Sequence, residues 1–88
     1  MSQFQKLLLS LLSGRSDHNI AFSDLTKLLE RLGFESRIKG SHHIFTKSDV
    51  EEILNLQARG SLAKPYQVKQ VRDVLIKYRL VNGGDNDE

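Results

Sequence analysis

Two adjacent histidines follow a basic residue, a glycine and a serine in the segment Lys39-Gly40-Ser41-His42-His43. A histidine side chain has an ordinary pKa of about 6.5, so it can accept or donate a proton at neutral pH. A cation and a hydroxyl can hold a phosphate and offset the negative charge that develops on it. These groups suit RNA cleavage, in which a 2′-hydroxyl loses a proton and a leaving 5′-oxygen gains one.

Strand parity predicts which histidine is free for that chemistry. Successive side chains of a strand point to opposite faces of the sheet, so the two histidines cannot enter one site. Phe45 is the natural core residue, and His43 shares its face and is expected to pack its ring against the core. His42 is then expected on the open face, as general base or acid. Arg37 and Lys39 are expected nearby, across a hairpin.

The substrate phosphate is expected to lie around His42. Lys39 and Arg37 would supply the positive charge that stabilises it. Gly40 would let the backbone approach the phosphate closely, and Ser41 can donate a hydrogen bond to it. Because only one histidine enters the site, Lys39 or water is expected to assist the second proton transfer. The sequence predicts neither a metal nor a cofactor, since no acid lies at ligand spacing from the histidine pair.

Apolar periodicity predicts an α+β fold. In the helix predicted over residues 22–32, Ser23 or Asp24 is expected to be the N-cap and Gly33 is expected to end the helix. Two helices would cover one face of a small three-stranded antiparallel sheet and leave the other face open, in the element order of double-stranded-RNA-binding domains. The predicted segments are a helix over residues 22–32, strands Phe34–Lys39, His42–Thr46 and Glu52–Gln57, a loop Ala58–Lys64, and a helix that begins at Pro65.

An extra helix is predicted at the N-terminus. Its apolar side chains recur at helical spacing, although the run is too short to span a bilayer and lacks the cleavage site of a signal peptide. The apolar stripe is expected either to extend the core or to join two subunits in a homodimer. The stripe consists of Phe4, Leu7, Leu8, Leu11 and Leu12.

The length of 88 residues predicts one domain. We expect residues 1–20 to form the amphipathic helical extension, residues 21–81 the RNA-binding or ribonuclease domain, and residues 82–88 a disordered acidic tail. The chain has no cysteine, which favours a reducing cytoplasm. No membrane association is expected.

The charge distribution favours a polyanionic partner such as RNA. The last four residues carry three of the eleven acids, so residues 1–84 hold 13 basic and 8 acidic residues, a net charge of +5. Residues 59–79 contain six basic residues and a single acid, Asp73. A polyanion is attracted to such a surface, although a solvated helix face accounts for the same charges.

The order of these features resembles the HicA family of bacterial toxins. The resemblance lies in the hydrophobic helix Asp24–Leu32, the following Gly33-Phe34, a basic strand, and then Gly40-Ser41-His42-His43 with Phe45 two places on. It covers residues 22–80. The chain differs from many members in residues 1–20 and in the segment Ala63–Arg72, so it resembles a longer branch of the family.

The resemblance implies a function as well as a fold. It implies a metal-independent mRNA endoribonuclease, the toxin of a type II toxin–antitoxin pair, inhibited by a HicB-like antitoxin protein. It also implies that the first histidine of the motif, His42, is catalytic. A second hypothesis stays open, in which the same fold is a non-catalytic RNA-binding or protein-interaction module and Gly40-Ser41-His42 only contacts phosphate.

Overall fold

A computed structural model describes residues 2–80 of the chain. The predicted acidic tail, residues 82–88, lies outside the described residues. The third strand begins two residues earlier than predicted, at Val50, so Ser48 and Asp49 alone form the turn before it. In chain order the elements are α1 (Gln3–Ser13), α2 (Phe22–Arg31), β1 (Glu35–Lys39), β2 (His42–Lys47), β3 (Val50–Leu56), β4 (Ala58–Arg59), β5 (Leu62–Ala63) and α3 (Pro65–Lys77).

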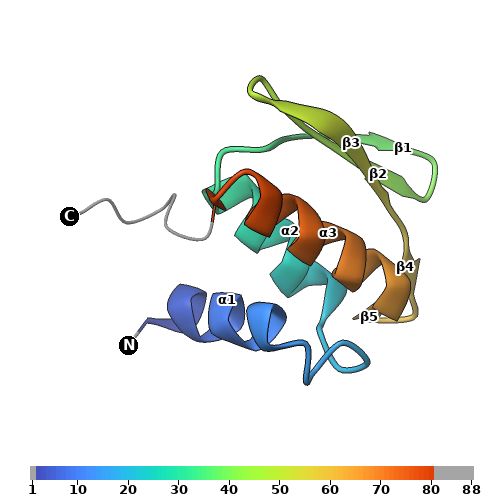
Figure 1. The fold of residues 1–88 in the computed structure, drawn as a ribbon. Helices are drawn as coiled ribbons and strands as arrows, with labels where there is room; N and C mark the ends of the chain where they lie inside the picture. Colours follow the sequence, from blue (N-terminus) through green and yellow to red (C-terminus); the bar gives the residue numbers. More distant parts are fainter. Residues whose placement is uncertain (1, 81–88) are drawn as a thin grey trace.

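The elements form layers (Figure 1). The antiparallel sheet β1-β2-β3 lies on one side of the helices α2 and α3, and α1 lies on the other side of these two helices. The α+β prediction, with one face of a three-stranded sheet covered by two helices and an extra N-terminal helix, is therefore confirmed. The opposite face of the sheet is left open.

The core lies between the sheet and the helix layer because each element directs one apolar face inward. Leucines of α2 at helical spacing and valines of α3 meet the alternate residues of β2 and β3. By contrast, every residue of the edge strand β1 is exposed, and Ile38 is 69% exposed, so the helices shield mainly β2 and β3. Side chains that are fully buried include Leu25, Leu28, Leu29, Phe45, Leu54, Leu56, Val68, Val71 and Leu75.

The segment predicted as a loop, Ala58–Lys64, contains a second small hairpin. Strands β4 and β5 pair antiparallel, and Gly60 makes the turn with a positive φ of 62°. The hairpin is fixed from outside, because the Ala63 N–H donates to the Ile20 carbonyl at 2.8 Å and the Phe22 N–H donates to the Ser61 carbonyl at 2.9 Å. This distant pairing has no signal in the local sequence, so the loop prediction was wrong.

The start of α2 also differs from the prediction. The N-cap is Ala21, without a side-chain hydrogen bond, and not Ser23 or Asp24. The Ser61 carbonyl accepts from the N–H of Phe22, which is the first of the amides left unpaired at the start of the helix. The helix begins at Phe22, the first residue of the predicted range, and Phe22 lies on its buried face.

The N-terminal helix packs into the core of the same chain. Leu8 and Leu11 are buried, and Phe4, Leu7 and Leu12 pack against the core in part. An ion pair joins the loop after α1 to α3: the Arg72 guanidinium donates to both carboxylate oxygens of Asp17, at 2.9 and 3.1 Å, and to the Leu11 carbonyl at 3.1 Å. The hydrogen bonds from Arg72 to Asp17 raise the pKa of the arginine. The apolar stripe thus extends the core.

A second polar contact joins the sheet to the end of α3. Lys77 donates to Glu52 at 2.8 Å, and the Tyr78 hydroxyl donates to the other oxygen of the same carboxylate at 2.7 Å. These hydrogen bonds, that from Lys77 first, lower the pKa of Glu52 to about 2. The same contact raises the pKa of Lys77.

The substitution Glu52→Gln is expected to reduce the loss of stability in acid. The stabilisation from ionised Glu52 is complete above its ordinary pKa of 4.5 and is lost as the pH falls toward the folded-state value of about 2. Urea unfolding followed from neutral pH to about pH 2 should therefore show a shallower decline in the variant. Glu35→Gln, on the exposed strand β1, is the matched control and should decline as the wild type does. Parallel curves for wild type and Glu52→Gln would contradict the role of Glu52.

Candidate active site

The open face of the sheet carries His42 in a row of side chains that crosses the strands. Residues that pair directly in antiparallel strands share a face, with Cα atoms about 4.5–5.5 Å apart. Lys39 pairs with His42, and Arg37 pairs with Ile44, which pairs in turn with Asn55. The structure therefore places Lys39 beside His42 and Arg37 one row further along the same face.

The second histidine lies on the opposite face. The His43 ring meets the ring of Phe22 on α2 edge to face, with centroids 4.9 Å apart and an angle of 78° between the planes. Phe45, on the same face, is fully buried. Thus His43 contributes to the packing between the sheet and α2, while His42 is exposed.

A hydrogen bond from the neighbouring strand orients His42. Its Nδ1 lies 2.9 Å from the Oδ1 of Asn55 on β3. An amide oxygen can only accept, so the ring proton of the neutral histidine belongs on Nδ1. The other ring nitrogen, Nε2, is then left with a lone pair. This tautomer is the form that can remove a proton from a substrate hydroxyl.

The turn before His42 is also held in place. Gly40 adopts a φ of 62°, in the left-handed region, and an added Cβ would meet no atom within 4 Å. The Gln57 carboxamide donates through Nε2 to the Ser41 hydroxyl oxygen at 2.8 Å, and its Oε1 accepts from the Lys64 ammonium at 3.1 Å. Because the Ser41 oxygen is the acceptor, its own proton can be donated to a ligand.

A buried glutamine connects these contacts to α3. Gln67 is only 6% exposed, and its Oε1 accepts from the Gln57 N–H at 3.0 Å. Its Nε2 donates to the Asn55 carbonyl at 3.2 Å. The Gln67 side chain on α3 therefore fixes the backbone of Gln57, which contacts the turn, and of Asn55, which contacts His42.

Comparison with known families identifies the family of the chain. The family model described as HicA toxin of bacterial toxin-antitoxin matches residues 22–77 of the chain. The chain belongs to the HicA toxin family. No curated protein and no solved structure matches it significantly. HicA proteins are toxins that act on RNA and pair with antitoxins, and the family is known for ribonucleases.

The family match leaves α1 outside its range. Residues 22–77 run from the start of α2 to the end of α3 and include the sheet with His42. In this HicA chain α1 precedes the matched region and covers the side of the helix layer that faces away from the sheet (Figure 1). Within residues 2–80, no helix has the length and apolar character needed to cross a membrane.

Three residues near His42 were missed by the sequence reasoning: Asn55, Gln57 and Lys64. The first two are polar positions that alternate with the buried Leu54 and Leu56, which was a usable signal for side chains on the open face. Lys64 had no such signal, because its position depends on the β4–β5 hairpin.

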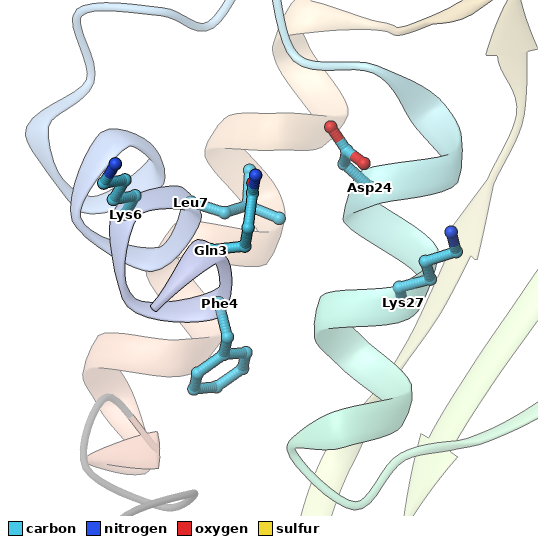
Figure 2. Close-up of a pocket in the computed structure, with 6 residues that line it drawn as sticks. All are labelled: Gln3, Phe4, Lys6, Leu7, Asp24 and Lys27. Carbon is cyan, nitrogen blue, oxygen red and sulfur yellow. The ribbon is translucent and has the colours of Figure 1, made fainter. Parts of the chain in front are cut away.

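One hollow of this HicA chain lies away from His42. It measures about 490 Å³ and is bordered by α1 and α2. Figure 2 shows Lys27 and Asp24 on α2 at one side of it and Gln3, Phe4 and Leu7 on α1 at the other. It contains no group suited to proton transfer at neutral pH. A second hollow, of about 390 Å³, includes Lys39 and therefore lies closer to His42. It is lined by Arg37, Ile38, Lys39 and Ile44.

Proposed function

We propose that this HicA chain is a metal-independent mRNA endoribonuclease, the toxin of a type II toxin–antitoxin pair, with His42 as its acid–base catalyst. The observation that supports this most directly is the hydrogen bond between His42 Nδ1 and Asn55, 2.9 Å long, on the open face of the sheet. It orients the imidazole and leaves Nε2 as a proton acceptor. Lys39, paired with His42, places a positive charge beside it.

The cleavage step follows from these groups. His42 Nε2 removes the proton of a 2′-hydroxyl, the 2′-oxygen attacks the adjacent phosphorus, and the bond from phosphorus to the 5′-oxygen breaks. The leaving 5′-oxygen takes a proton from water or from Lys39. Lys39, Arg37 and the Ser41 hydroxyl stabilise the charge on the phosphorane. The products are a 2′,3′-cyclic phosphate and a 5′-hydroxyl.

The partners follow from the same proposal. The substrate is mRNA and the inhibitor is a HicB-like antitoxin, and the site of action is the cytoplasm. A homodimer through the N-terminal helix stays a prediction, although the stripe that was expected to form it packs largely within the chain. The alternative is a non-catalytic RNA-binding or protein-interaction module.

A cleavage assay in the presence of EDTA tests the function. Purified protein is mixed with a long labelled RNA and, in parallel, with the same RNA carrying 2′-O-methyl groups. Cleavage of the unmodified RNA alone, with 2′,3′-cyclic phosphate ends, would establish metal-independent attack by the 2′-hydroxyl. Retention of both RNAs on a filter without cleavage of either would favour the binding module.

Asn55 is expected to act as a positioning residue for His42. Asn55→Ala removes the acceptor of the Nδ1 proton, so we expect kcat to fall about ten- to a hundredfold while KM changes little. Asn55→Asp keeps an acceptor at the same place and should restore most of the rate. The ¹⁵N chemical shifts of the His42 ring should show mixed tautomers in the alanine variant only. An unchanged tautomer in Asn55→Ala would rule out the positioning role.

A further inference from the structure

On the open face of the sheet, Lys64 and Lys39 lie on opposite sides of His42. Gln57 follows Leu56, which pairs with His43, so continuing this register by one residue places Gln57 beside His42. Lys64 in turn donates to the Gln57 carboxamide at 3.1 Å. The order across the open face is therefore Lys39, His42, Gln57 and Lys64, with a cation at each end.

Within residues 2–80, Lys64 forms no ion pair with a carboxylate. Four basic residues there form ion pairs with carboxylates: Lys47, Lys69, Arg72 and Lys77. Lys64 instead donates to a neutral amide, the side chain of Gln57. An amide oxygen holds an ammonium group in place without neutralising it, so the charge is available to a ligand.

The same carboxamide also orients the Ser41 hydroxyl. Gln57 donates to Ser41 and accepts from Lys64, so one planar group holds a hydrogen-bond donor and a cation close together on one side of His42. Its backbone is fixed in turn by the buried Gln67. Two oriented donors beside a proton acceptor are the features expected of a phosphate subsite.

We propose that one RNA strand crosses the sheet at right angles to its strands, along Lys39, His42 and Gln57, and that Lys64 binds a phosphate of that strand on the side away from Lys39. The inference rests on the proposed ribonuclease function and adds a phosphate subsite to it. A hollow lined by Arg37, Ile38, Lys39 and Ile44 lies at the Lys39 end of this path, where it would receive the nucleotide next to Lys39.

The salt dependence of RNA binding tests this path without requiring cleavage. The probe is a 2′-O-methyl RNA, which cannot be cut, titrated at several salt concentrations with wild type and Lys64→Met. Loss of one phosphate contact should reduce the slope of log affinity against log salt by about 0.7 for a single strand. Affinity at low salt should fall about tenfold. Lys64→Arg should keep the slope, and the double variant Lys39→Met, Lys64→Met should lose about twice as much.

Lys27→Met is the matched control, because Lys27 borders the hollow between α1 and α2, away from the open face of the sheet (Figure 2). Its slope should equal that of the wild type. An unchanged slope in a folded Lys64→Met, with RNA cleavage by the wild type, would overturn the path and leave the ribonuclease function standing. A reduced slope without any cleavage by the wild type would support the path and overturn the catalytic function.

Discussion

Replacing His42 with alanine is expected to lower the rate of RNA cleavage in EDTA by about 100- to 10,000-fold, the usual contribution of a positioned acid–base group. The expected loss is large because His42 is the histidine on the open face, and its Nε2 is the acceptor left by the Asn55 hydrogen bond. The measurement is kcat on a defined RNA. Circular dichroism should show an unchanged fold, since the side chain is exposed.

His43→Phe is the matched control for this experiment. His43 meets Phe22 edge to face, and a phenyl ring preserves that packing while it removes the imidazole. We expect this variant to cut RNA at nearly the wild-type rate. Activity that survives in His42→Ala and disappears in His43→Phe would show that the assignment of the two histidines is reversed.

Arg72→Met is expected to cost about 3 kcal/mol of the free energy of unfolding. The Arg72 and Asp17 side chains are only 15% and 18% exposed, so removal of the guanidinium leaves a poorly solvated carboxylate. The Leu11 carbonyl also loses one of its two donors and keeps only the Gly14 N–H. Methionine keeps part of the apolar length of the side chain, so the change reports mainly the lost polar contacts. Urea unfolding at neutral pH measures it.

Lys69→Met provides the comparison on the same helix. Lys69 pairs with Asp73 at 3.4 Å, but both side chains are more than 60% exposed. Such surface pairs contribute about 0–1 kcal/mol, so this variant should unfold almost as the wild type does. Equal losses of stability in the two variants would mean that the contact between Arg72 and Asp17 does not hold the N-terminal extension.

The sequence predicted those features that depend on residues close together in the chain. Alternation along one strand separates His42 from His43, and the structure places them on opposite faces. The helical stripe of α2 and the glycine turn before His42 are likewise properties of short segments.

The remainder of the site depends on contacts between distant segments. The register between β2 and β3 shifts at a bulge between Phe45 and Lys47. No residue pattern in the sequence predicts this bulge. That register brings Asn55 to His42. The position of Lys64 depends on the β4–β5 hairpin, which in turn pairs with residues before α2. Sequence separation in these pairs is too large for periodicity to report.

Because of the Gln67 carboxamide, the geometry of the site depends on how α3 packs against the sheet. It connects α3 to the backbone of Asn55 and Gln57, and these two hold His42, Ser41 and Lys64. On the proposed mechanism, a chain whose α3 has not yet docked lacks the contacts that hold its proton acceptor and Lys64 in place. Cleavage of RNA would therefore require that α3 has docked against the sheet.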